Sequence, residues 1–206
     1  IKENLRKICT AEEMRKIEVI NLDAWVANFL RQQGYEYQVV YDNETDKVWE
    51  DALAFAAGDV NLIPNFYKDE WVKVVQAQEV YDKVSYCKAS RIGRGVRLDR
   101  KVRMQIWDVF DEYQNIMNEK LQRDVETAMY ECRKILENKK LTGQYTSIIV
   151  DEGQDLSPSA YRLLRSLAGE EHENDIFIVG DSHQRIYRNK AVLSKCRSEE
   201  HTSELQ

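Results

Sequence analysis

The sequence is sparing with cysteine, proline and long apolar runs. Its four cysteines stand far apart without a CxxC pair, which argues against a zinc site or a disulfide framework and is typical of a reducing, cytoplasmic location. No stretch approaches the length of apolar chain that crosses a bilayer, so we expect no membrane partner. None of the eight glycines falls in a G-x-x-x-x-G-K-S/T pattern, which excludes a phosphate-cradling P-loop within these residues.

The remaining composition indicates a folded fragment. An apolar content of 43% with four Trp and eleven Tyr predicts a globular protein, and 206 residues suffice for one core or two subdomains. The chain opens on Ile1 instead of Met, as a fragment would. Residues 197–206 resemble the in-frame translation of a sequencing-adapter oligonucleotide, so we exclude them from the fold as a non-native, unstructured tail. A genuine polar tail is the alternative.

A short β-branched run, Thr146–Val150, leads directly into the acidic segment Asp151–Asp155. Such a run is typical of a strand buried on both faces of a parallel sheet, and open α/β sheets bind ligands at the carboxyl ends of their strands. Two adjacent carboxylates there can divide one task. Asp151 would hold Mg²⁺ through a hard oxygen, and Glu152 would orient and activate the water that attacks a phosphate, as in Walker B chemistry. An Asp-Glu pair that merely ends a strand is the alternative.

A second strand is predicted at Ile176–Val179, and the polar segment 180–184 follows it. The residues between the two strands predict a helix that Ser157 caps. Strand, helix and strand form a βαβ unit, which is almost always right-handed and parallel. We therefore expect Asp151 and Gln184 at the same edge of neighbouring parallel strands.

These residues resemble the UvrD/Rep/PcrA-type superfamily 1 helicases. Residues 151–155 match the family's motif II pattern D-E-x-Q-D, and residues 180–187 match its motif III pattern G-D-x-x-Q-x-I-Y. The resemblance implies Mg²⁺ and ATP as cofactors, with single-stranded DNA or a duplex junction as the partner. It assigns a role to five side chains: Mg²⁺ ligand for Asp151, catalytic base for Glu152, γ-phosphate sensor for Gln184, and a link between the bound nucleotide and the motor for Gln154 and Asp155.

Motif III departs from the family pattern after Tyr187. Many relatives continue with x-W-R-G-A, whereas this chain has Arg188, Asn189, Lys190 and Ala191, so a base-stacking Trp is replaced by Asn189. Tyr187 remains a candidate for stacking on a base. Arg188 and Lys190 remain candidates for nucleic-acid contact, although Lys190 lacks the planar fork of the arginine it replaces.

A basic segment, Lys88–Arg103, carries seven cations against one acid, a local charge of +6 in a chain of net charge −6. Its glycine-rich centre predicts a loop. Arginines on such a loop can follow a phosphate backbone, so we predict that Arg91, Arg94 and Arg97 contact nucleic acid. The alternative is a charged face whose arginines pair with nearby acids.

Near the start of the chain, residues 1–16 predict helix and Ile17–Ile20 a short strand. A helix capped by Asp23 should follow. The polar cluster at this turn resembles motif Ib of the family, which implies that Asn21 touches the nucleic-acid backbone; a helix cap without such contact is the alternative. The alternation over Tyr35–Tyr41 predicts a half-exposed strand.

Helical periodicity dominates the middle of the chain, with apolar faces over residues 48–56, 71–75, 100–121 and 125–136, and its tryptophans are expected in a core. The resemblance implies the order 1–41 for the first part of motor domain 1A, 42–118 for a helical insertion called 1B, and 119–196 for the second part of 1A. We therefore predict an α/β fold: a partial RecA-like parallel sheet of the P-loop NTPase type, lacking the P-loop, with a mainly helical inserted subdomain.

The predicted function is that of a fragment of an ATP-dependent DNA helicase or translocase, inactive as a hydrolase by itself, and the resemblance implies 3′→5′ polarity. The main alternative is a nucleic-acid-binding module that keeps a degenerate helicase fold and hydrolyses nothing. An unrelated P-loop ATPase is disfavoured, because Walker B chemistry alone would not supply the G-D-x-x-Q-x-I-Y segment.

Overall fold

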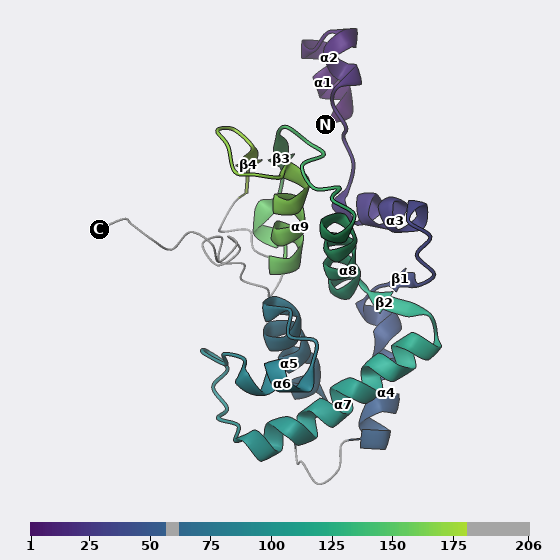
Figure 1. Ribbon diagram of the computed structural model, residues 1–206, viewed down its shortest axis with the longest axis vertical. Helices are drawn as coiled ribbons and strands as arrows, with labels where there is room; N and C mark the ends of the chain where they lie inside the picture. Colours follow the sequence, from purple (N-terminus) through teal and green to yellow (C-terminus); the bar gives the residue numbers. More distant parts are fainter. Residues whose placement is uncertain (57–61, 181–206) are drawn as a thin grey trace, which may run out of the picture. The chain divides into compact units, whose positions relative to one another are not determined.

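The computed structural model describes residues 1–56 and 62–180. These residues fall into two compact units, Ile1–Tyr35 and a second unit that begins at Glu36. Figure 1 labels the helices and strands along the chain. In the first unit the helices are α1 (Lys2–Ile8), α2 (Ala11–Arg15) and α3 (Leu22–Gln32). A capping box between Thr10 and Glu13 begins α2, and α3 buries an apolar face on which Trp25 and Phe29 stack at 5.2 Å.

Two local predictions for the first unit are wrong. Residues 17–20 form no strand, because no second strand pairs with them among the described residues. The cap of α3 is Asn21 instead of Asp23: the Asn21 Oδ1 atom accepts hydrogen bonds from the backbone N–H groups of Asp23 and Ala24 at 2.9 and 3.4 Å. Asn is as good an N-cap as Asp, so the sequence favoured neither strongly.

The second unit contains two short strands that pair in parallel although they are far apart in the sequence, β1 (Gln38–Val40) and β2 (Gln122–Asp124). The strand predicted over Tyr35–Tyr41 is therefore confirmed only over Gln38–Val40. Helical segments fill the chain between the two strands: α4 (Asp42–Ala56), α5 (Pro64–Glu70), the π-helix η1 (Trp71–Gln76), α6 (Lys83–Lys88) and α7 (Arg100–Glu119).

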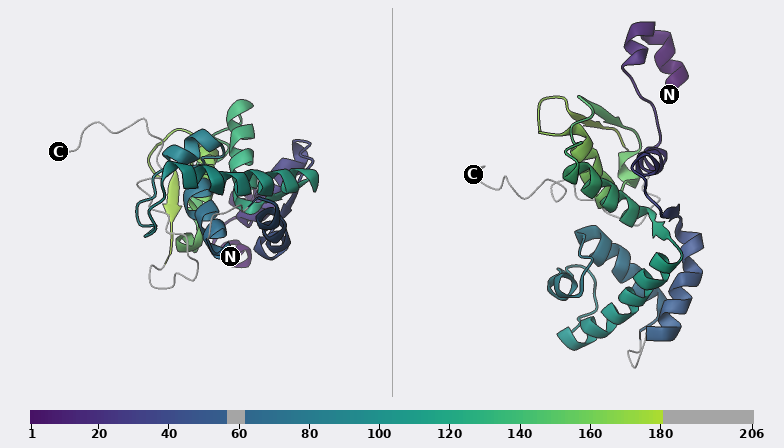
Figure 2. Two further views of the ribbon diagram at one scale, coloured as in Figure 1. Left: turned by 90° about the horizontal axis from the view of Figure 1, so that it is seen from below. Right: turned by 45° about the vertical axis from the view of Figure 1, so that its right-hand side comes forward.

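These helices share one hydrophobic core, whose buried residues run from Val40 to Met117. Helix α4 lies alongside α7 (Figure 2). Between these two helices the Trp49 and Tyr113 rings stack with their centroids 4.0 Å apart, and Trp71 packs edge-on against Tyr113 at 5.3 Å. The prediction that the tryptophans serve as core is confirmed for Trp49 and Trp71.

The βαβ unit consists of β3 (Ile148–Val150), α9 (Pro158–Ala168) and β4 (Ile176–Ile178). The strands are neighbours and parallel, as predicted. The Ser157 hydroxyl accepts a hydrogen bond from the backbone N–H of Ala160 at 3.1 Å and so caps α9, which is also as predicted. Helix α8 (Val125–Asn138) packs against α9.

The prediction that both faces of this sheet are buried is wrong. Val150 is 8% exposed, but Ile149 is 76% exposed and Phe177 is 63% exposed. Alternate residues of a strand point to opposite faces, so one face is covered and the other faces solvent. No helix in the described part of the chain combines the length and the apolarity needed to cross a bilayer.

Candidate functional site

The acidic turn, defined here as Asp151–Asp155, follows β3 directly. Asp151 and Glu152 are both exposed at the carboxyl edge of the two parallel strands. Glu152 has left-handed backbone angles, φ 53° and ψ 37°, and begins the short 3₁₀ helix η2 (Gly153–Asp155). For a residue other than glycine, this conformation is about 1 to 2 kcal/mol less stable than the right-handed one. Strained residues of this kind concentrate at functional sites, and Glu152 is one of five non-glycine residues with positive φ in the described part of the chain.

Polar contacts within the turn fix the Glu152 side chain. The Gln154 Nε2 group donates to Glu152 Oε2 at 2.7 Å and lies 3.4 Å from Asp155 Oδ2. The Asp151 Oδ1 atom accepts from the Glu152 backbone N–H at 3.1 Å. The other Asp155 oxygen is buried, and no residue in the described part of the chain donates a hydrogen bond to it. Gln154 therefore orients the carboxylate of Glu152, a specific contact that the motif pattern alone did not show.

The start of motif III touches the acidic turn. The Gly153 N–H donates to the Val179 carbonyl at 2.8 Å, and the Val179 N–H donates to the Val150 carbonyl at 2.8 Å. Gly180 lies so close that a Cβ atom there would stand 2.4 Å from Gln154 Oε1. The two motifs thus leave the sheet at one edge and are in direct contact.

The remaining motif III residues lie outside the described residues. These are the predicted γ-phosphate sensor Gln184 and the candidate nucleic-acid contacts Tyr187, Arg188 and Lys190. Their roles stay predictions.

Gly153 is required by packing. A Cβ atom on this residue would lie 2.4 Å from the Ile178 Cγ2 atom of β4 and 3.1 Å from the Tyr161 hydroxyl of α9. That hydroxyl donates to the Gly153 carbonyl at 2.5 Å, so Tyr161 helps to hold the acidic turn. No signal in the sequence points to this role, because Tyr161 resembles any partly apolar residue of a helix.

Gly153→Ala is expected to destabilise the protein by about 1 to 3 kcal/mol, the usual effect of forcing a methyl group into a packed interior. Urea unfolding followed by circular dichroism measures the change. Ile178→Ala removes the clashing atom, so the double variant should lose less stability than the sum of the two single variants. Additive losses would contradict the proposed steric cause.

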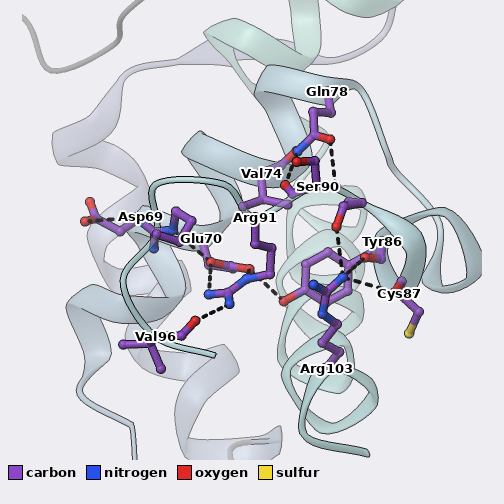
Figure 3. A network of polar contacts seen from close by, with 12 residues as sticks. Asp69, Glu70, Val74, Gln78, Tyr86, Cys87, Ser90, Arg91, Val96 and Arg103 are labelled. Atoms are coloured by element: carbon purple, nitrogen blue, oxygen red, sulfur yellow. Dashed lines mark hydrogen bonds and ion pairs between the residues drawn. The ribbon is translucent and has the colours of Figure 1, made fainter. Parts of the chain in front are cut away.

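The basic segment is held in place by a buried acid, Glu70 (Figure 3). Arg91 donates to both Glu70 carboxylate oxygens, at 2.5 and 2.9 Å, and Arg94 donates to Oε2 at 3.0 Å. The Tyr86 hydroxyl adds a hydrogen bond of 3.1 Å to the same carboxylate. Glu70 is fully buried, and the Arg91 side chain is only 5% exposed. Burial, and then the charge of Glu70, raises the pKa of Tyr86, so its hydroxyl stays a donor.

Two further contacts fix the course of the loop. Arg91 Nη1 donates to the Val96 carbonyl at 2.5 Å, and Arg103 Nη1 donates to the carbonyls of Cys87 and Ala89 at 3.0 Å each (Figure 3). The backbone at the centre of the segment is a loop, as predicted.

The prediction that Arg91 and Arg94 contact nucleic acid therefore needs correction. Their guanidinium groups are used inside the helical core, so the alternative of pairing with an acid describes them. Arg97, by contrast, is exposed, as are Arg100 and Lys101 at the start of α7. None of these last three takes part in the ion pairs seen in the described part of the chain. Nucleic-acid contact remains a prediction for Arg97. It also remains one for Asn21, whose side-chain oxygen serves the α3 cap.

The acidic turn is compatible with Mg²⁺. The described residues contain no group of three or more His, Cys, Asp or Glu that could enclose a metal ion. Mg²⁺ does not need such a group, since it keeps several waters and takes one or two carboxylates together with substrate phosphates. The exposed Asp151 carboxylate would supply one such ligand.

Parallel strands joined by a helix, with an acidic turn at their carboxyl edge, define an α/β domain. Residues 1–199 match the family model of the UvrD/REP helicase N-terminal domain, and the chain belongs to this family. The resemblance inferred from the two motifs is thereby confirmed.

Two curated proteins are similar to parts of the chain. DNA helicase IV of Escherichia coli (strain K12) is 35% identical over 65 residues, which are 32% of this chain and 10% of that protein. The putative ATP-dependent DNA helicase YjcD of Bacillus subtilis (strain 168) is 31% identical over 88 residues, 40% of this chain and 11% of that protein. The chain thus aligns with about a tenth of each relative.

Proposed function

We propose that this chain is part of the first motor domain of an ATP-dependent DNA helicase or translocase that moves 3′→5′ on single-stranded DNA. One observation supports this most: at the carboxyl edge of two parallel strands, Gly180 at the start of motif III lies against Gln154 of the acidic turn. The names of the two relatives, a DNA helicase and a putative ATP-dependent DNA helicase, agree with it.

The proposed domain order has the inserted subdomain 1B at residues 42–118, between two parts of a RecA-like domain 1A at residues 1–41 and 119–196. Its support is the hydrophobic core that helices α4 to α7 share. In the sequence these helices come between β1 and β2, the two strands that pair with each other. Parallel strands need a long crossover, and an inserted subdomain supplies one.

The proposed chemistry belongs to five side chains. Asp151 would hold Mg²⁺, which when bound offsets negative charge on the transferred phosphate. Glu152 would orient the attacking water and accept its proton, and the Gln154 contact keeps that carboxylate in one place. Gln184 would sense the γ-phosphate, and Asp155 with Gln154 would link the nucleotide to the rest of the motor. This chain lacks a P-loop, so we expect no hydrolysis from it alone.

The proposed nucleic-acid contacts centre on the exposed cations Arg97, Arg100 and Lys101. Helix α7 has no acid in its first turn. Positive charges at a helix N-terminus oppose the helix dipole, so these residues do not serve to stabilise α7. Their arrangement favours an anionic partner. Asn21, Tyr187, Arg188 and Lys190 are proposed as further contacts.

Replacing Arg97, Arg100 and Lys101 together with Gln is expected to weaken binding of a single-stranded oligonucleotide. The slope of log affinity against log salt should fall by up to about one phosphate contact per cation removed. Fluorescence anisotropy at several salt concentrations measures this. Lys47→Gln, which removes an exposed cation of α4, is the control and should leave the slope unchanged. An unchanged slope in the triple variant would contradict the interface.

A non-hydrolysing nucleic-acid-binding module is the second candidate, and the missing P-loop pattern is the observation that favours it. The two candidates differ in one activity: the motor hydrolyses ATP in a reaction that depends on single-stranded DNA, and the binding module does not. The measurement that distinguishes them needs a protein that joins a P-loop and a second motor domain to this chain.

A further inference from the structure

Residues 76–79, called the junction below, follow one another at the end of the helical stretch that contains η1. Each makes a polar contact with a different part of the second unit. Gln76 Nε2 donates to Asp124 Oδ1 at 2.8 Å, and the same carboxylate oxygen caps α8 by accepting from the Thr127 N–H at 2.8 Å. Gln78 forms two hydrogen bonds with the backbone of Ser90, at 2.8 and 3.0 Å. Ser90 lies at the start of the basic loop, the name used below for the non-helical residues 89–99 of the basic segment.

The other two junction residues contact α9 and α8. Arg162 of α9 donates through Nη2 to the Ala77 carbonyl at 2.9 Å, and its Nη1 lies 3.4 Å from the Glu79 carboxylate, close enough for an ion pair but without hydrogen-bond geometry. Arg133 of α8 binds the other Glu79 oxygen. One carboxylate therefore joins the end of η1 to both helices.

The backbone of Glu79 points to a role for its side chain. This residue has φ 55°, the left-handed conformation in which helices usually end on glycine. It occupies the position with a mostly buried carboxylate, 13% exposed, that meets two arginines. A glycine would suit the backbone better, so the ion pairs explain why glutamate stands here.

Arg162 has Tyr161 as its neighbour on α9, and the Tyr161 hydroxyl donates to the Gly153 carbonyl of the acidic turn. Adjacent residues of one helix thus touch the turn on one side and the junction on the other. The contacts form an unbroken series: Gly153, Tyr161, Arg162, the junction, and Ser90 at the base of the basic loop. A rigid helix carries a displacement between neighbours on it more directly than a loop does.

We propose that Arg162 and Glu79 are positioning residues that couple the acidic turn to the basic loop. This inference rests on the proposed function, since it takes nucleic acid as the ligand of the basic loop. Binding there would shift the loop base at Ser90, and the junction and α9 would pass that shift to Gly153. Coupling between sites is reciprocal, so a ligand at the acidic turn would change affinity at the basic loop by the same factor.

The test is an NMR titration of the ¹⁵N-labelled 206-residue chain with an oligothymidylate. The backbone amides of Gly93 and Gly95 report on the basic loop, and the amide of Gly153 reports on the acidic turn. We expect all three to shift in the unaltered chain. In Arg162→Gln the loop amides should still shift, while the Gly153 shift should be lost. Glu79→Gln removes the same ion pair from the other side and should behave alike.

Lys47→Gln is the control, because it removes an exposed cation of α4 whose partners, Glu50 and Asp51, lie outside the series. It should leave all three shifts in place. A Gly153 shift that persists in Arg162→Gln and in Glu79→Gln would overturn the coupling, as would loop shifts without a Gly153 shift in the unaltered chain. Absence of shifts at Gly93 and Gly95 in the unaltered chain would instead contradict the nucleic-acid interface itself, and with it the inference.

Discussion

Glu152→Gln is expected to lower ATP turnover by about 100- to 10,000-fold, the range that a general base contributes. The variant must be made in a protein that adds a P-loop and a second motor domain to this chain, because phosphoryl transfer depends on positioning groups that these residues do not contain. The amide keeps the size of the side chain and its contact with Gln154 but cannot accept the proton of the attacking water. Single-turnover hydrolysis measures the effect.

Asp151→Asn is the partner variant, and the two should separate. Glu152→Gln should leave the affinity for Mg²⁺-ATP nearly unchanged, which is the signature of an interaction made mainly in the transition state. Asp151→Asn should weaken nucleotide binding and its dependence on Mg²⁺ together, because it removes a charged ligand of the metal. Near-normal hydrolysis in Glu152→Gln would sink the assignment of the base.

Glu70→Gln is expected to destabilise the chain by about 3 to 5 kcal/mol, the effect of breaking a buried ion pair by removing one partner. The change leaves the guanidinium groups of Arg91 and Arg94 buried beside a neutral amide. Urea unfolding followed by tryptophan fluorescence suits this measurement, because Trp49 and Trp71 lie in the same core.

Glu50→Gln is the matched control for Glu70→Gln. Glu50 is a helical glutamate whose side chain is 71% exposed and whose partner, Lys47, is equally exposed. Exposed pairs of this kind contribute about 0 to 1 kcal/mol, so the control should unfold almost like the unaltered chain. Equal, small losses in both variants would show that Glu70 does not anchor the basic segment, and would restore Arg91 and Arg94 as candidates for nucleic-acid contact.

The parts of the fold that could be predicted from the sequence depend on local signals. The cap at Ser157 and the β-branched runs on either side of α9 mark a βαβ unit, and the handedness rule then makes its strands parallel. Strand β2 could not be found this way: Gln122–Asp124 is polar and only three residues long, and it becomes a strand because β1 pairs with it. Helix α7 ends at Glu119, whereas the predicted apolar face continues to Leu121. Leu121 has left-handed backbone angles, with φ 51°, and is not part of the helix.

In the candidate site, too, some features follow from local sequence patterns and others depend on residues that are distant in the sequence. The motif patterns located the acidic turn, but the pairing of the basic segment depended on Glu70, which lies 21 and 24 positions before Arg91 and Arg94. Seven cations in one segment suggest a binding surface when only neighbours in sequence are visible. The fold brings an acid to some of them. Gly153 could not be explained from the sequence either, since the motif allows any residue there. The close approach of Ile178 and Tyr161 in the fold explains the glycine.

The proposal that this chain belongs to a motor is tested most directly by the rate of ATP hydrolysis with and without single-stranded DNA. The protein to use joins a P-loop and a second motor domain to this chain. We predict hydrolysis that requires Mg²⁺, rises when single-stranded DNA is added, and is lost in Glu152→Gln. Tight binding of single-stranded DNA without any ATP hydrolysis would contradict the motor and support the nucleic-acid-binding module instead.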